Sequence, residues 1–284
     1  MMKKFAIVTD STAYFTNEQF EEYGIKRGSL NIIAGDNTYR EVDMVNEDVY
    51  KLFDQGHKLT TSQPSPGEFL SIYEGLIKEG YEFIFVFVIA QPLSGTYQSA
   101  KLAVNMMDDP SLIHVFENNM AAFGVEMHLL TLMEFINEGL SKEVIIERVQ
   151  KNIENSKLVF TSLDLVSLIK SGRVSKAKGL IGSLLRVKPV VKMEDGKLNL
   201  FHIARTTKKA MILQLDYLKN ELKDGYKKLH VRVCNHNSPE LAVKIKEEVQ
   251  RLYKDAIISF GDYVGPVFNV HLGPKGFGIS WYTE

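Results

Sequence analysis

The chain of 284 residues contains a single cysteine, Cys234, and no long apolar run. One cysteine cannot form an intrachain disulfide, which argues against a secreted fold stabilised by disulfides. The apolar stretch from Phe5 to Val8 is too short for the core of a signal peptide. No segment approaches the roughly 20 apolar residues that a membrane-spanning helix needs. We therefore expect a cytoplasmic protein without stable membrane insertion.

An excess of charge of either sign is also missing. The chain has 34 Lys and Arg against 35 Asp and Glu, so its formal net charge is −1. This balance provides no basic surface for nucleic acid, and we expect no nucleic-acid partner. The 7 histidines show no metal-ligand spacing, and Cys234 beside His236 is not enough for a zinc site. We expect no metal and no cofactor.

Strands and helices alternate in the first half of the chain, which is typical of a parallel α/β sheet. The predicted strands cover 4–8, 30–33, 83–90 and 112–116, and the predicted helices 17–24, 46–53, 66–80, 96–107, 120–137 and 144–153. Residues 83–90 are apolar almost throughout, as expected of a central strand covered on both faces.

The pattern changes after about residue 156. Further strands are predicted at 158–161, 187–192, 198–203, 229–233 and 256–260, with helices at 206–222 and 241–252. Asp195-Gly196 between two strands favours a tight hairpin and hence antiparallel pairing. We predict an α/β fold of two domains. Residues 1–156 form a parallel sheet flanked by helices, and residues 157–284 a mixed α/β domain.

Hydroxyl-rich loops precede two helices of the first domain, at Thr61-Ser62 and at Ser94-Gly95-Thr96. Ligands of open parallel sheets bind beyond the carboxyl ends of the strands, where helix N-termini favour anions. Hydroxyls and amides without a nearby lysine suit a carboxylate better than a triphosphate. Taken singly, Ser94 and Ser65 are better explained as helix caps. Together the loops predict an anion site.

The helix at 120–137 is apolar nearly all round, so it is either buried or lines an apolar space. Phe123 and Met127 are candidates for lining such a space. Ordinary core positions are the alternative for both.

Several short motifs occur along the chain in a characteristic order. They are Thr9-Asp10-Ser11-Thr12, Thr61-Ser62-Gln63-Pro64-Ser65-Pro66, Leu93-Ser94-Gly95-Thr96-Tyr97-Gln98-Ser99-Ala100, Ser171-Gly172-Arg173-Val174-Ser175 and His271-Leu272-Gly273-Pro274. This order resembles the DegV family, whose members include the fatty-acid-binding subunits of bacterial fatty acid kinase. The likeness extends from Ile7 to the C-terminus.

The resemblance implies a lipid-binding N-terminal domain and a ligand, a long-chain fatty acid. Thr61 and Ser94 would bind the carboxylate through their hydroxyls. Arg173 and His271, from the second domain, would lie near the mouth of the site and meet the carboxylate or the acyl phosphate.

Ser62, Gly95 and Thr96, which lie in the same two loops, are additional candidates for the head-group site. An apolar tunnel within the first domain would hold the acyl chain, with Phe123 and Met127 as possible lining residues. The partner would be the ATP-binding subunit of fatty acid kinase, so this chain would be a non-catalytic subunit.

Two other classes of function remain open. A serine-dependent acyl hydrolase would use Ser94 as nucleophile and His271 as base, although the chain lacks a Gly-x-Ser-x-Gly elbow around Ser94. A structural or interaction protein would carry no ligand.

Overall fold

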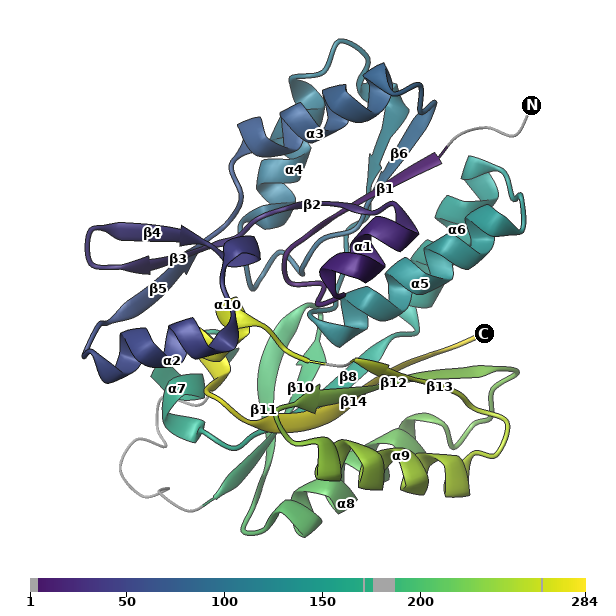
Figure 1. Ribbon diagram of the computed structural model, residues 1–284. Helices are drawn as coiled ribbons and strands as arrows, with labels where there is room; N and C mark the ends of the chain where they lie inside the picture. Colours follow the sequence, from purple (N-terminus) through teal and green to yellow (C-terminus); the bar gives the residue numbers. More distant parts are fainter. Residues whose placement is uncertain (1–4, 171, 176–186, 262) are drawn as a thin grey trace.

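The computed structural model describes residues 5–170, 172–175, 187–261 and 263–284. Ser171, which begins one of the motifs above, lies outside the described residues. The fold is α/β, with a parallel sheet in the first half of the chain and a larger mixed sheet in the second half (Figure 1). Among the described residues, no helix combines the length and apolar character needed to cross a membrane.

The first sheet has the strand order β2-β1-β6-β7, and all of its pairs are parallel. Its strands are β1 (Phe5–Asp10), β2 (Lys26–Gly28), β6 (Phe83–Val86) and β7 (Ile113–Val115). The prediction of a central parallel strand is confirmed in β6, every residue of which is buried. The strand ends at Val86, and the chain stays buried to Ala90 as it leaves the sheet.

Helices cover both faces of this sheet. Because neighbouring residues of a strand point to opposite faces, Ala6 and Val8 pack under α3 (Pro66–Lys78) and α4 (Thr96–Asn105), while Ile7 faces the other side. That other side is covered by α1 (Asn17–Tyr23), α5 (Phe123–Asn137) and α6 (Lys142–Glu154). Ser65 caps α3 through the Glu68 N–H, and Pro66 occupies its first turn.

A small antiparallel sheet of order β4-β3-β5 lies beside the first sheet. Its strands are β3 (Asn31–Ala34), β4 (Asn37–Arg40) and β5 (Leu59–Ser62). They are accompanied by the short helix η1 (Glu41–Asp43) and by α2 (Asn46–Asp54). We expected a polar loop from Thr60, but Thr60 to Ser62 belong to β5. These residues extend because they pair with β3, a long-range contact that local polarity does not reveal.

The second sheet has the strand order β13-β12-β14-β8-β10-β11-β9. Its strands are β8 (Lys157–Ser162), β9 (Val174–Ser175), β10 (Lys188–Glu194), β11 (Lys197–Ala204), β12 (Leu229–His236), β13 (Ile257–Gly261) and β14 (Gly276–Thr283). The predicted hairpin is confirmed between β10 and β11, with Asp195 and Gly196 both at positive φ (50° and 71°). Helices α8 (Thr207–Glu221) and α9 (Pro239–Leu252) cover its outer face.

Strand β14 is absent from the sequence-based prediction, yet it lies between β12 and β8 inside the second sheet. A Cβ on Gly276 would come within 2.7 Å of the Thr161 carbonyl oxygen, and one on Gly278 within 2.6 Å of that of Val159. The glycines permit this close approach, but they also weaken the strand pattern in the sequence.

Helix α5 lies between the two sheets, as its apolar character predicts (Figure 1). Its Glu126 pairs with Arg232 of β12 at 2.7 Å from Oε2 to Nε, and both side chains are buried. Glu126 Oε1 also accepts a hydrogen bond from the Tyr14 N–H. The same apolar cluster therefore contains residues from both halves of the chain. The domain boundary near residue 156, between α6 and β8, stays a prediction.

Candidate functional site

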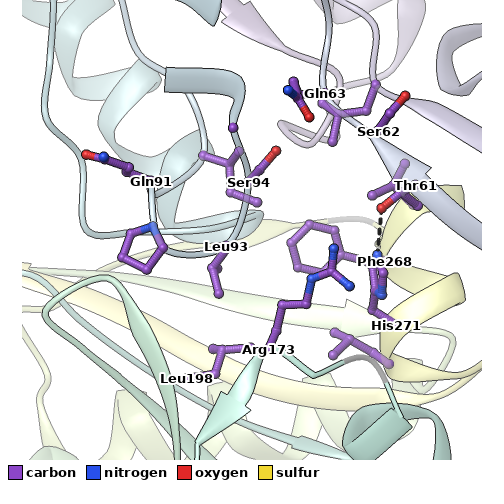
Figure 2. A pocket seen from close by; sticks show the side chains of 16 residues that line it. Thr61, Ser62, Gln63, Gln91, Leu93, Ser94, Arg173, Leu198, Phe268 and His271 are labelled. Carbon is purple, nitrogen blue, oxygen red and sulfur yellow. Dashed lines mark hydrogen bonds between the residues drawn. The ribbon is translucent and has the colours of Figure 1, made fainter. Parts of the chain in front are cut away.

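A cavity of about 360 Å³ opens where the small sheet, the loop between β6 and α4, and the helix α10 (Pro266–Leu272) meet. We call this cavity the mouth. Figure 2 shows Thr61, Ser94, Arg173 and His271 around it, from segments far apart in the sequence. All four predicted head-group residues line the mouth, together with Ser62 and Gly95. Thr96, also a candidate, does not line it.

Thr61 and His271 contact each other on one side of the mouth. Thr61 Oγ1 of β5 lies 2.8 Å from His271 Nε2 of α10 (Figure 2). Burial, together with the positive charge of Arg173, lowers the pKa of His271 to about 4. The imidazole is therefore neutral near pH 7. It can donate one hydrogen bond and accept another, and it adds no charge to the mouth.

Ser94 stands on the opposite side, just before α4. Its Oγ lies 2.8 Å from Thr96 Oγ1, and the Thr96 N–H also points to it, at 3.4 Å. Gly95 is the N-cap residue of this helix and has no side chain that could cap it. A Cβ on Gly95 would lie 2.9 Å from Gln63 Nε2, so glycine allows the Gln63 carboxamide to pack on the backbone beside Ser94.

Arg173 comes from the second half of the chain, immediately before β9. In Figure 2 its guanidinium points into the mouth beside Phe268. The preceding Gly172 has a φ of 72°, a conformation that glycine adopts without strain. Arg173 adds a positive charge and a planar set of donors to the mouth.

Asp10 holds the loop that carries Ser94. Its fully buried carboxylate accepts hydrogen bonds from the Ile89 N–H at 2.7 Å and from Thr12, through both the N–H and the hydroxyl. Thr9 Oγ1 donates to the carbonyl of Phe87 at 2.7 Å. The Thr9-Asp10-Ser11-Thr12 motif therefore positions the chain leaving β6, a role that the sequence did not reveal.

Glu41 fixes the position of α10, on the other side of the mouth, and was not among the predicted residues. Its buried carboxylate accepts hydrogen bonds from Ser11 Oγ at 2.5 Å, Tyr14 Oη at 2.9 Å and the Val267 N–H at 2.8 Å. Val267 belongs to α10, which carries Phe268 and His271 into the mouth. Burial raises the pKa of Glu41 to about 7. The sequence alone could not have linked residue 41 to residue 267.

A second, narrow cavity of about 30 Å³ adjoins the mouth, and the two share four apolar lining residues, Leu93, Leu198, Phe268 and Leu272. It lies between the two sheets, whereas we expected a tunnel within the first domain. Further apolar lining comes from both halves of the chain and consists of Ala121, Ala122, Phe123, Leu158, Phe160, Met193, Val264 and Phe277. Phe123 is therefore a lining residue. Met127 is buried on α5 but does not line this cavity.

The polar side chains in the wall of this apolar cavity form hydrogen bonds elsewhere. Thr161 Oγ1 accepts from Gln214 Nε2 at 2.9 Å, and Ser162 Oγ donates to the Leu272 carbonyl at 2.7 Å. His236 Nε2 donates to the Gly273 carbonyl at 2.7 Å. Cys234 of β12 also lines the cavity, and burial raises the pKa of its thiol. Among the described residues, no group of His, Cys, Asp or Glu side chains is placed to hold a metal ion.

The fold and the cavities define an α/β protein of two domains whose polar mouth continues into an apolar interior. The model of the DegV family, a family of uncharacterised proteins, matches residues 4–284. The chain is 31% identical to a DegV domain-containing protein of Halalkalibacterium halodurans over 100% of both chains. It is 33% identical to one of Staphylococcus aureus over 98% of each. This protein belongs to the DegV family.

Solved structures of the family have the same fold. One is the structure of a fatty-acid-binding DegV family protein from Thermus thermophilus. It has a TM-score of 0.87 and 25% sequence identity, and the match covers 99% of this chain and 100% of that one. DegV of Bacillus subtilis, a fatty acid binding protein, has a TM-score of 0.82 and 31% identity over the same shares.

Proposed function

We propose that this protein binds a long-chain fatty acid, with the carboxylate in the mouth beside Thr61 and Ser94 and the acyl chain in the apolar cavity. The observation that carries the proposal is the continuity between a polar mouth and an apolar cavity through their shared lining residues. An amphipathic ligand with a small polar head suits this arrangement. The relatives from Thermus thermophilus and Bacillus subtilis, which bind fatty acids, support it.

Burial of the acyl chain supplies most of the affinity. At about 0.8 kcal/mol per methylene, a long chain contributes on the order of 10 kcal/mol as an upper bound. The narrow cavity must widen as the chain enters, so part of this free energy is spent on moving side chains of the wall. Retention of the ligand through purification is the expected consequence.

The mouth reduces the cost of removing the carboxylate from water. An unpaired buried carboxylate costs several kcal/mol, and the Thr61 and Ser94 hydroxyls offset this by donating hydrogen bonds. The N-terminus of α4 and the Arg173 guanidinium add favourable electrostatics. If His271 Nε2–H donates to Thr61, the Thr61 proton is free for the ligand.

We further propose that this protein acts in the cytoplasm and presents the carboxylate to the ATP-binding subunit of fatty acid kinase. A carboxylate oxygen would attack the γ-phosphorus of ATP on the partner, forming the acyl phosphate and releasing ADP. Arg173 at the mouth suits the doubly charged product better than the singly charged acid. The present chain would bind and orient the acid and would need no metal or cofactor of its own.

The hydrolase alternative is less well supported by the geometry. The hydrogen bonds pair Ser94 with Thr96 and His271 with Thr61, so Ser94 is not the hydroxyl that faces the histidine. A histidine whose pKa is about 4 is also a weak general base at neutral pH. We expect no turnover of short acyl esters.

The test of fatty-acid binding is native mass spectrometry of the purified protein before and after organic extraction. We expect one fatty acid of roughly palmitate-to-oleate length per chain. Extraction that releases only nucleotide, sugar phosphate or nothing would contradict the proposal. If the extraction yields no ligand at all, the result would favour a structural or interaction protein.

A further inference from the structure

Thr96 lies directly behind Ser94 and is separated from the mouth by it. Thr96 Oγ1 is 2.8 Å from Ser94 Oγ, its side chain is fully buried (0% exposed), and it does not line the mouth. Thr96 therefore cannot contact a head group in this arrangement. Its hydroxyl needs another explanation than direct binding.

Burial determines which of the two hydroxyls donates. If Ser94 donated to Thr96, the Thr96 proton would need a second acceptor, and water does not reach it. Among the described residues, the Thr96 hydroxyl has its hydrogen bond with Ser94 Oγ alone. Because an unsatisfied buried donor is costly, Thr96 donates and Ser94 accepts.

The Ser94 oxygen then accepts hydrogen bonds from two directions. The Thr96 hydroxyl approaches at 2.8 Å and the Thr96 N–H at 3.4 Å. A hydroxyl has two acceptor lone pairs and one proton. With both lone pairs engaged, the remaining function of Ser94 is donation, and its half-buried side chain donates into the mouth.

We propose that Thr96 is a positioning residue that keeps Ser94 a hydrogen-bond donor and thereby makes the mouth select head groups that only accept. An ionised carboxylate or an acyl phosphate fits this pattern. A fatty alcohol or a fatty amide carries its own proton donor, for which Ser94 offers no lone pair. This inference rests on the proposed fatty-acid site and goes beyond it to the basis of its selectivity.

The experiment compares Thr96→Val, which keeps the β-branched shape and removes the hydroxyl, with Thr96→Ser, which keeps the hydroxyl. Dissociation constants for palmitate and 1-hexadecanol are measured on the delipidated full chain by displacement of a fluorescent fatty acid. We expect Thr96→Val to weaken palmitate binding roughly 2- to 10-fold, the net cost of losing the hydrogen bond between two neutral hydroxyls that keeps Ser94 a donor. Hexadecanol binding should change less than about twofold, because the alcohol head group does not depend on Ser94 acting only as a donor. Thr96→Ser retains the acid selectivity of the wild type.

Ser99→Ala is the matched control, because Ser99 is another buried hydroxyl of α4 that does not line the mouth. It should leave the ratio of the two dissociation constants unchanged. Equal weakening of both ligands by Thr96→Val, with a lower melting temperature, would mean a structural role and overturn the inference. Should Thr96→Val not fold, Thr96→Ala tests the same ratio.

The two proposals fail in different ways. A wild type that binds neither palmitate nor hexadecanol refutes the fatty-acid site itself. A wild type that prefers palmitate, beside a Thr96→Val variant with the same preference, refutes the role of Thr96 alone.

Discussion

The hydrogen bond between Thr61 and His271 joins residues 210 positions apart and closes one side of the mouth. Thr61 belongs to the small sheet, and His271 to α10 near the end of the chain. Helix α10 reaches this place because Val267 and Val270 pack with Ile32 of β3 in one apolar cluster. A helix from the second half of the chain thus completes a site whose two head-group hydroxyls, those of Thr61 and Ser94, come from the first half. Substitution of Thr61 or of His271 should therefore affect ligand binding as well as stability.

Removal of the head-group hydroxyls should weaken fatty-acid binding. We expect Thr61→Ala and Ser94→Ala each to cost about 1–3 kcal/mol, because a buried carboxylate loses a donor. Ser62→Ala should cost less, since the family resemblance assigns the carboxylate contact to its neighbour Thr61, although Ser62 also lines the mouth. Calorimetric titration of delipidated protein with palmitate measures all three. Equal and negligible effects would place the head group elsewhere.

His271 should titrate at acidic pH. Burial and the charge of Arg173 lower its pKa from 6.5 to about 4, so a ¹H–¹⁵N NMR titration should place the imidazole transition near pH 4. Between these values the unfolded chain binds more protons at this position than the folded chain. The contribution of His271 to stability therefore falls as the pH drops from 6.5 to 4. In Arg173→Ala the pKa should rise, and a transition near 6.5 in the wild type would contradict this prediction.

Parts of the fold with strong local signals could be predicted from the sequence. The apolar run of β6, the Asp195-Gly196 turn and the largely apolar α5 can each be recognised within a short stretch of sequence. The polar residues of the mouth were predicted through motifs, and the structure brings Thr61, Ser94, Arg173 and His271 together.

Other features depend on long-range contacts, and local patterns do not encode them. Glycines interrupt the strand pattern of β14 in the sequence, yet the close approach of β8 requires them. β5 is extended only because it pairs with β3. The link from Glu41 to Val267 joins segments 226 residues apart. The position of the apolar cavity between the sheets likewise depends on how the two halves pack.

Phe123 should influence which acyl chains are bound. It lines the apolar cavity, so Phe123→Leu enlarges or reshapes that space and should shift the bound fatty acids toward longer or bulkier chains. Met127→Leu is the control, because Met127 is buried on the same helix but does not line the cavity. Mass spectrometry of extracted lipids from both variants makes the comparison. The same shift in both would indicate a general change in packing.

The buried ion pair between Glu126 and Arg232 should matter for stability more than for selectivity. Glu126→Leu leaves the Arg232 guanidinium buried without its main partner, and we expect a loss of about 3–5 kcal/mol in the free energy of unfolding. The double variant Glu126→Leu, Arg232→Met should be destabilised less than this single variant, because no charge is left unpaired. Urea unfolding measures the free energy of unfolding of the two single variants, Glu126→Leu and Arg232→Met, and of the double variant. A double variant as unstable as the sum of its single variants would show that the pair is not coupled.

Arg173 should separate lipid binding from the reaction on the partner. We expect Arg173→Ala to keep most of its fatty acid, because burial of the acyl chain supplies the bulk of the affinity. Acyl-phosphate formation with a cognate kinase and ATP should fall, because a doubly charged phosphate depends on the guanidinium more than a carboxylate does. Lipid occupancy and phosphorylation are measured on the same folded samples. Arg251→Ala is the control, an exposed arginine of α9 paired with Glu248 and away from the mouth. Loss of occupancy and phosphorylation in strict proportion, or of neither, would defeat this division of roles.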